Sequence, residues 1–396
     1  MTDWRAILCA CWLGLAGLSS AQSPTEPTEP TAHLVTYGQG SEVWEWFGHN
    51  ALWLQDPSKG LDHTFSFGYF NINEAGFYRR FIQGEMSYFG TAVRADREFG
   101  FYRQADRSIR VQTLNLSQTQ FDQLHGLLVN AIEPYPRYYS YDYFLANCST
   151  WLRDLLDDTL DGALSRQFGD MPGAKSFRAH TYAQTQHQPW AQLGLMTLLG
   201  PAADQPIQAW DEAFLPAVLA DQIGQVRVAG EPLLVADQWL YQPSEPLEAS
   251  MGRGLWRALF LGLLLGGLIV WGGARKGWGS RLVQSLAVIG LSITGLVLIG
   301  MWAFTAHTVV AHNPGLALVH PLWVGLLPGL SQRVGSAMWW VCLATSILGA
   351  LGWVVSGIWP HQDVMAFIIP SVVALLWVTR PSAAPDRLAG PAQAGG

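Results

Sequence analysis

The pattern of apolar and polar positions divides the chain into two parts. Up to about residue 250, short alternating runs and amphipathic stretches are separated by polar turns. From about residue 255, long apolar runs follow one another. Alternation with a period of two predicts strands, a period of 3.6 predicts helices, and long apolar runs predict membrane spans. The sequence therefore predicts an α+β domain followed by an all-α transmembrane bundle.

The first part is expected to begin with strands and to continue with helices. A helix is predicted after Ser117, which forms a capping box with Gln120, and Pro134 is expected to end it. A second helix is predicted to be capped by Ser149 or Thr150 and to run to about residue 160. The predicted strands are 33–37, 44–54, 64–70 and 108–114.

The second part contains apolar runs of spanning length. A further run, Leu316–Leu330, is interrupted by Pro321 and Pro328, so it is either a fifth span or a re-entrant segment. With the first domain outside, Arg275, Lys276 and Arg281 would lie on the cytoplasmic side. Five spans would also place Arg333, Arg380 and Arg387 there, whereas four spans would leave these three outside, so the positive-inside rule favours five. The loop 303–314 would then face the periplasm beside the first domain. The four clearer runs are Leu255–Gly273, Leu282–Phe304, Met338–Ile358 and Val364–Val378.

The N-terminal segment has the pattern of a secretory signal. Arg5 precedes a short apolar core, and small residues follow at 19–21. We expect a cleaved signal, with an uncleaved anchor as the alternative. The predicted division of the chain is a signal at 1–21, a flexible lead at 22–32, a periplasmic domain at 33–249, a transmembrane domain at 250–380 and a flexible tail at 381–396.

Composition narrows the possible partners. The formal net charge is −7, only 13% of residues are charged, and there is no basic cluster, which argues against a nucleic-acid partner. Histidines and cysteines lack metal-ligand spacing, and there is no glycine-rich phosphate loop. We therefore expect no metal and no cofactor.

Cysteine positions single out one thiol. Cys9 and Cys11 lie in the predicted signal and Cys342 lies in a predicted span, so Cys148 is the only thiol expected in the exported domain. It lies at a helix start, where free N–H groups and the positive end of the helix dipole favour a thiolate and an oxyanion. The sequence favours a nucleophile over a buried packing residue.

A cysteine nucleophile needs a base, which is usually an imidazole. His49 follows Gly48 inside an aromatic strand, where a rigid backbone would hold its ring. It is therefore the preferred base. The other histidines of the domain, which flank turns or lie on polar or amphipathic stretches, are His33, His63, His125, His180 and His187.

Several motifs together resemble one family. They are Phe47–Leu52, Phe67–Phe70, Asn115–Ser117 and Tyr141–Asp154, with weaker matches at 199–204 and 214–216. In this order they are similar to the Lnb-type periplasmic domain, which is associated with an alternative bacterial lipoprotein N-acyltransferase. That family is similar to the permuted branch of the NlpC-type, papain-like superfamily, which includes lecithin retinol acyltransferase.

The resemblance implies roles for individual residues. Cys148 would be the nucleophile and His49 the base, because the histidine precedes the cysteine in the permuted branch. A third polar residue would orient the imidazole. The family usually has Asn where this chain has Ser66, so Ser66 and His63 both remain candidates. The oxyanion or substrate-binding positions would be Asn147, Ser149 and Thr150.

The function implied is a membrane-anchored thiol acyltransferase of the bacterial inner membrane, with its soluble domain in the periplasm. An acyl chain would pass from a phospholipid, through a thioester on Cys148, to the N-terminal amine of a lipoprotein. The membrane, the phospholipid donor and the lipoprotein acceptor are the expected partners. The alternatives are a papain-like hydrolase of cell-wall peptides or amides and a non-catalytic envelope scaffold.

Overall fold

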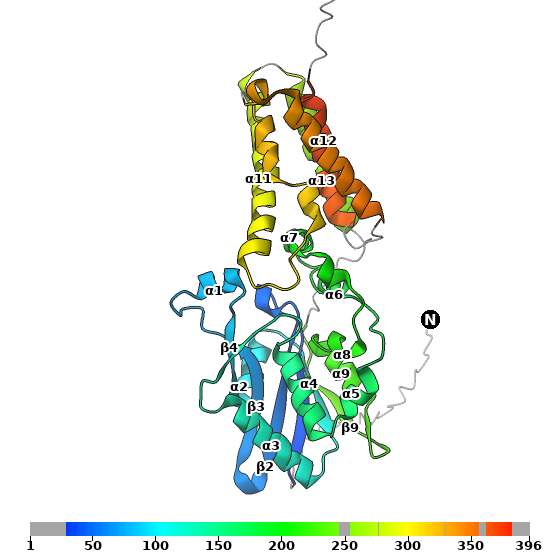
Figure 1. The fold of residues 1–396 in the computed structure, drawn as a ribbon. Helices are drawn as coiled ribbons and strands as arrows, with labels where there is room; N and C mark the ends of the chain where they lie inside the picture. Colours follow the sequence, from blue (N-terminus) through cyan, green and yellow to red (C-terminus); the bar gives the residue numbers. More distant parts are fainter. Residues whose placement is uncertain (1–28, 245–253, 276, 329, 356–361, 382–396) are drawn as a thin grey trace, which may run out of the picture.

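The chain forms a mixed α/β domain joined to a bundle of long helices (Figure 1). The computed structural model describes residues 29–244, 254–275, 277–328, 330–355 and 362–381. The expected signal, most of the expected lead and nearly all of the C-terminal tail lie outside these residues. The last two residues of the expected lead, Thr31 and Ala32, belong to the first strand.

A seven-stranded antiparallel sheet forms the centre of the first domain. Its strand order is β6-β4-β3-β2-β1-β5-β9, so the four strands β4 to β1 lie side by side as a meander. β9 comes from the end of the domain and pairs with β5 at one edge. The strands are β1 (Thr31–Tyr37), β2 (His49–Asp56), β3 (Leu61–Tyr69), β4 (Ser87–Arg94), β5 (Ile109–Leu114), β6 (Tyr138–Ser140) and β9 (Leu234–Tyr241).

Helices cover both faces of this sheet. α3 (Gln118–Ile132) and α4 (Cys148–Thr159) pack on the face that carries Leu52 and Phe67. α2 (Ala95–Gln104) packs on the opposite face against Ala51. Since successive side chains of a strand point to opposite faces, neighbouring residues of β2 face different helices. The sequence did not predict α2.

The boundaries of several elements differ from the expectations. The strand expected from residue 44 begins only at His49, because Val43–Glu45 form a short 3-10 helix, η1, and Gly48 is in the left-handed region with φ 79°. α4 begins at Cys148, so the cap is Asn147 and not Ser149 or Thr150. The Ser117–Gln120 capping box and the end of α3 before Pro134 are confirmed.

Short helices and one hairpin complete the first domain. These elements are α1 (Phe77–Gln83), η2 (Pro57–Lys59), α5 (Ala163–Phe168), α6 (Phe177–Gln184), α7 (Pro189–Leu198), η3 (Pro201–Asp204), α8 (Ala209–Glu212), α9 (Pro216–Ile223), β7 (Arg227–Val228) and β8 (Glu231–Pro232). α5 to α9 and the hairpin lie between α4 and the edge strand β9 in the chain, whereas α1 and η2 lie between earlier strands. Of these elements, α1, α6 and α7 lie nearest the bundle (Figure 1).

The bundle contains four long helices in the described residues. α10 (Gly254–Gly273) runs parallel to α13 (Gln362–Val378), and α11 (Trp278–Phe304) and α12 (Ser331–Val355) complete it. Glycines allow α10 and α13 to approach closely: a Cβ at Gly262 would lie 2.5 Å from the Ala366 oxygen, and one at Gly266 would lie 2.8 Å from the Pro370 oxygen.

The segment expected to be a fifth span or a re-entrant loop is not an α-helix. It forms two 3-10 helices, η4 (Pro314–Ala317) and η5 (Pro321–Leu326), and a 3-10 helix of six residues is only about 12 Å long. The segment nevertheless runs antiparallel to α12, because Ala317 lies against Gly349 while Gly325 lies against Met338. It therefore leads the chain from the end of the bundle near the sheet domain toward the other end.

With this path, successive helix ends alternate between the two ends of the bundle. α11 ends beside the sheet domain, whereas the end of α10, the start of α12 and the end of α13 lie at the opposite end of the bundle (Figure 1). Arg275 and Arg380 lie two residues after the ends of α10 and α13. Arg275 and Arg380 stack on Trp271 and Trp377, with 3.8 and 4.3 Å from the guanidinium carbon to the ring centre. The described arginines that are expected on the cytoplasmic side therefore lie at one end of the bundle, away from the sheet domain.

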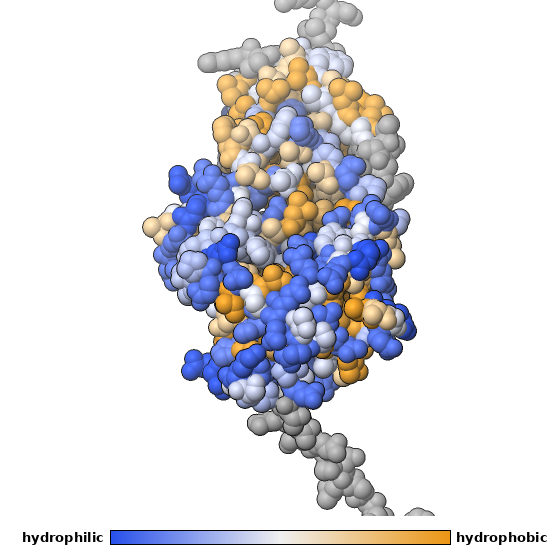
Figure 2. Space-filling view, turned by 60° about the horizontal axis from the view of Figure 1, so that its bottom comes forward, coloured by the Kyte–Doolittle hydropathy of each residue, from blue (hydrophilic) through white to orange (hydrophobic). Residues whose placement is uncertain are grey.

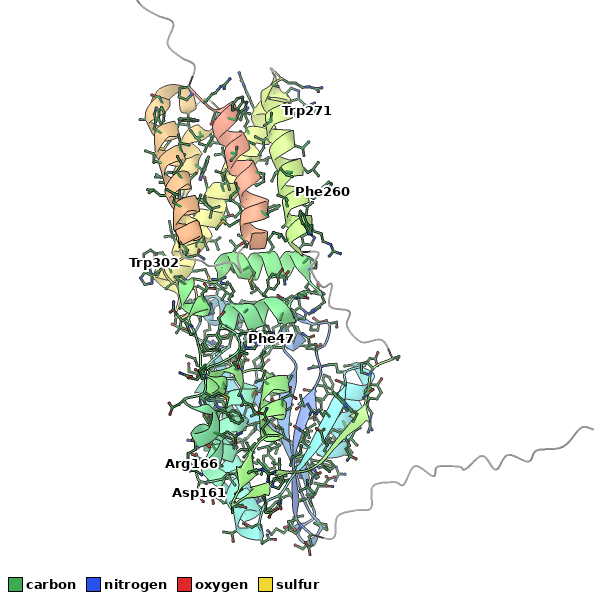
Figure 3. All side chains as sticks on the ribbon, turned by 90° about the vertical axis from the view of Figure 1, so that its right-hand side faces the viewer. Phe47, Asp161, Arg166, Phe260, Trp271 and Trp302 are labelled. Atoms are coloured by element: carbon green, nitrogen blue, oxygen red, sulfur yellow. The ribbon has the colours of Figure 1, made fainter. Side chains whose placement is uncertain are left out.

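Two helices, α10 and α11, are long and apolar enough to cross a membrane, and only 22% of their most apolar stretches is buried. Figure 2 shows apolar side chains gathered on the bundle, while the sheet domain is mostly hydrophilic with scattered apolar patches. In Figure 3, Phe260 and Trp271 project outward from α10, and Trp302 lies at the end of α11 near the sheet domain. A bundle with such a surface is typical of a membrane domain.

The loop after α11 joins the two parts. The Ala306 amide donates to the Gln83 carbonyl at 2.7 Å, and the Gly200 amide donates to the Val309 carbonyl at 2.7 Å. The side chain of Asn313 donates to the Thr197 and Leu199 carbonyls at 2.8 and 3.1 Å. The expectation that loop 303–314 lies beside the first domain is confirmed.

Candidate functional site

The site is built around the start of α4. Cys148 is the first residue of this helix and is buried, with 9% of its surface exposed. The Asn147 side chain caps the helix, since its Oδ1 accepts from the Ser149 and Thr150 amides at 2.9 and 3.0 Å. The Thr150 hydroxyl in turn accepts from the Asn147 amide at 2.8 Å. The helix start, and with it the thiol, is therefore held in one position.

Four polar contacts fix this helix start to its surroundings. The Asn147 Nδ2 donates to the Tyr143 and Phe214 carbonyls, both at 2.9 Å. The Ser149 hydroxyl lies 2.6 Å from the Ala213 carbonyl and 2.9 Å from Asn50 Oδ1. The side-chain donors of Asn147, Ser149 and Thr150 thus all have acceptors within the protein.

The thiol is neutral in this environment. Burial raises the pKa of Cys148 to about 11, although the backbone N–H groups of Asn50, Ser149 and Cys148 and the charge of Arg107 act in the opposite direction. The N–H groups of the helix start lower the pKa, as the sequence predicts, but burial acts more strongly in the opposite direction. The same N–H groups show that donors surround the sulfur.

His49 lies at the start of β2, directly before Asn50. Its ring contacts Tyr37, Tyr69 and Tyr102, with ring centres 6.1, 6.4 and 6.4 Å away. Burial and, to a smaller extent, the charge of Arg107 lower the pKa of His49 to about 3. At neutral pH the imidazole is therefore uncharged and has a free electron pair.

The structure brings Cys148 and His49 to the same end of the sheet, but on different sides of β2. The side chain of Asn50 faces α4, and the adjacent His49 contacts Tyr102 of α2. Among the described residues, no hydrogen bond joins the thiol to the imidazole. The two groups still share one electrostatic environment, since the charge of Arg107 lowers the pKa of both.

Ser66 lies on the same face of the sheet as His49. It pairs with Ala51, two residues after His49, and side chains two apart on a strand share a face. Its hydroxyl donates to Glu98 Oε1 at 3.0 Å. His63 pairs with Leu54, five residues from His49, and so lies toward the other end of the strand. Of the two candidates for the third role, Ser66 therefore lies closer to His49 along the paired strands.

Two buried charged residues of this site were not predicted from the sequence. Glu98 on α2 accepts from Ser66, and burial raises its pKa. Arg107 pairs with Glu45 at 3.1 Å, donates to the Gly38 carbonyl at 2.9 Å and stacks on Tyr102. The apolar positions of residues 95–104 repeat with helical spacing, which could have revealed α2, but nothing local indicates which sheet face it covers.

The conformation of Gly68 explains why a glycine follows the aromatic Phe67 near the end of β3. Gly68 has φ 95°, lies where β3 shifts register against β4, and a Cβ there would lie 3.6 Å from Tyr141 and 3.7 Å from the Cβ of Cys148. The backbone of β3 thus approaches Cys148 closely. Within the described residues, no group of three or more His, Cys, Asp or Glu side chains could hold a metal ion.

Comparison with known proteins gives one family match, in the N-terminal part of the chain. Residues 20–183 match the model of the Lnb N-terminal periplasmic domain. This match supports the resemblance to the Lnb-type family that the motifs predict for the N-terminal domain. Together with the apolar helices α10 and α11, it indicates a membrane protein with a periplasmic domain. No curated protein and no solved structure matches the chain.

Proposed function

We propose that the protein is a cysteine-dependent acyltransferase that moves an acyl chain from a phospholipid to the N-terminal amine of a bacterial lipoprotein. The observation that carries this proposal is the sulfur of Cys148 at the start of α4, surrounded by backbone N–H groups. His49, on the adjacent strand end, is the candidate base. The family match supports the same reading.

The protonation states suggest how the reaction begins. At neutral pH both partners are uncharged, because the pKa of Cys148 is about 11 and that of His49 about 3. A preformed thiolate–imidazolium pair is therefore absent, and the proton leaves the thiol as the sulfur attacks the ester carbonyl. His49 receives this proton and passes it to the glycerol oxygen of the departing lysophospholipid.

The second half of the reaction regenerates the enzyme. The lipoprotein amine attacks the thioester carbonyl, His49 takes the amine proton, and the sulfur leaves and regains a proton as the thiol. The backbone N–H groups of Cys148 and Asn50 are the candidate donors to the oxyanion in both halves. Ser66 and Glu98, which lie on the His49 side of the sheet, are candidates for positioning its imidazole.

The fold and location extend this proposal. A helix that begins with the cysteine and packs on an antiparallel sheet carrying an earlier histidine is similar to the permuted papain-like arrangement. Anchoring in the inner membrane would hold the domain beside both lipid-attached substrates and raise their effective concentration.

Mass spectrometry of lipoprotein N-terminal peptides tests the proposal. A strain that lacks its usual acyltransferase would express the native chain, Cys148→Ser, His49→Ala or the control Cys342→Ser, which changes the other buried cysteine. A third acyl chain should appear with the native chain and the control and be lost in the other two. Altered muropeptides with unchanged lipoproteins would indicate a hydrolase, and full function of both site variants would indicate a scaffold.

A further inference from the structure

The short helix α1 carries an apolar side that the protein leaves uncovered. Tyr78 and Ile82 lie one turn apart, with 66% and 62% of their surfaces exposed, and Phe81 is 40% exposed. Phe77 instead stacks inward on Phe70, with ring centres 5.4 Å apart. The helix is therefore held by one aromatic side, while its second apolar side faces outward.

The position of α1 is fixed against the end of α11. The Gln83 carbonyl accepts from the Ala306 amide at 2.7 Å, and the Phe81 carbonyl lies 3.2 Å from the His307 imidazole. Gly84, with φ 76°, permits this approach, because a Cβ there would lie 2.9 Å from the His307 amide nitrogen. In Figure 1, α1 lies beside the lower end of α11.

That end of α11 has the features of a membrane–water boundary. The apolar helix stops at Phe304, and Trp302 and Phe304 are 45% and 77% exposed. Aromatic residues concentrate at this depth in membrane proteins. The exposed Arg79, next to Tyr78, adds a positive charge that complements phospholipid phosphates.

We propose that α1 is a second membrane contact of the periplasmic domain, with Tyr78, Phe81 and Ile82 inserted among the phospholipid headgroups of the outer leaflet. An amphipathic helix at an interface lies in its plane and buries its apolar side at the headgroup–acyl boundary. The partner of this apolar side is the bilayer surface, because α1 lies at the level where the apolar surface of α11 ends.

Aromatic contacts connect this helix to the candidate site. From Phe77 they pass to Phe70, then to Tyr88 at 5.0 Å and to Tyr141 at 4.4 Å. Tyr141 lies close to the nucleophile, since the Cβ position of Gly68 is within 3.7 Å of both Tyr141 and Cys148. The membrane contact therefore lies at one end of an aromatic row that ends near the thiol.

Photo-crosslinking in vesicles tests this contact. The full chain, with p-benzoylphenylalanine in place of Tyr78, would be reconstituted in phosphatidylethanolamine–phosphatidylglycerol vesicles and irradiated. The matched control carries it in place of Val235, which is 64% exposed on β9, away from the bundle in Figure 1. Intact mass should reveal phospholipid adducts about fivefold more often at position 78.

A second substitution distinguishes insertion of α1 among the headgroups from simple proximity to the bilayer. Ile82→Asp, which alters an exposed side chain, should lower the adduct yield at position 78, whereas Val235→Asp should leave it unchanged. Equal yields at positions 78 and 235, an unchanged yield in Ile82→Asp, or crosslinks to a second copy of the chain in place of lipid would each overturn the proposal.

Discussion

The side-chain amide of Asn147 donates to the Phe214 carbonyl at 2.9 Å while its oxygen caps the helix that begins at Cys148. One residue thus ties α4 to a loop 67 positions later in the chain. Position 147 therefore combines local helix capping with a long-range contact.

Asn147→Ala should lower stability because it removes the cap and leaves buried carbonyls without a donor. We expect a loss of about 2–4 kcal/mol, well above the ~1 kcal/mol of an ordinary cap. Thermal unfolding of the detergent-solubilised chain measures it. The control is Ser117→Ala, which removes the exposed cap of α3. Equal losses in both variants would contradict the double role of Asn147.

The reactivity of Cys148 should rise steeply with pH. With a pKa of about 11, only about one thiol in a thousand is ionised at pH 8. The rate of iodoacetamide labelling should therefore increase about tenfold for each pH unit between 8 and 10. Peptide mass spectrometry follows the modification of Cys148. A labelling midpoint near pH 7 would show that the thiolate is stabilised in the free enzyme.

Arg107→Gln should move this labelling profile to still higher pH. The charge of Arg107 lowers the pKa of Cys148, so its removal lets burial act with less opposition. The variant also leaves Glu45 without its ion-pair partner. The double variant Glu45→Gln, Arg107→Gln controls for that loss and should show the same shift. A profile unchanged in both variants would place Arg107 outside the electrostatics of the site.

Glycine substitutions should separate backbone strain from steric conflict. Gly48→Ala combines φ 79° with a Cβ only 2.8 Å from the Tyr37 carbonyl, whereas at Gly68 the φ is 95° but contacts are ordinary. We expect losses of about 1–2 kcal/mol for Gly68→Ala from strain alone, and more for Gly48→Ala. Gly100→Ala, in open space on α2, should stabilise slightly. Chemical unfolding gives the ranking, and a reversed order would refute it.

Acid should destabilise the domain through two histidines. Burial lowers the pKa of His33 to about 4 and that of His49 to about 3. Below the ordinary pKa of 6.5 the unfolded chain binds protons that the folded chain does not, so stability falls as the pH drops from about 6.5 toward 3–4. His33→Gln should reduce this slope in unfolding experiments between pH 7 and 4. A slope that the variant leaves unchanged would contradict the buried, neutral His33.

The sequence alone determined the parts of the fold that depend on local pattern. The capping box at Ser117, the start of a helix at Cys148 and the long apolar runs all follow from spacing and side-chain type, and the structure has them at or near the predicted positions. The cysteine count likewise singled out Cys148. These features are local, because a few residues within one or two turns decide them.

Only the tertiary structure decided what surrounds the thiol. Burial sets the protonation of Cys148 and His49, and it depends on how α4 and α2 pack on opposite faces of the sheet. Asn147 acts as cap and anchor because Phe214 folds back onto it. Glu98 enters the site through α2 and Arg107 through the turn after it. The proline-containing segment 314–326 passes along α12 without forming an α-helix. Each depends on contacts between residues far apart in the chain, which local spacing does not encode.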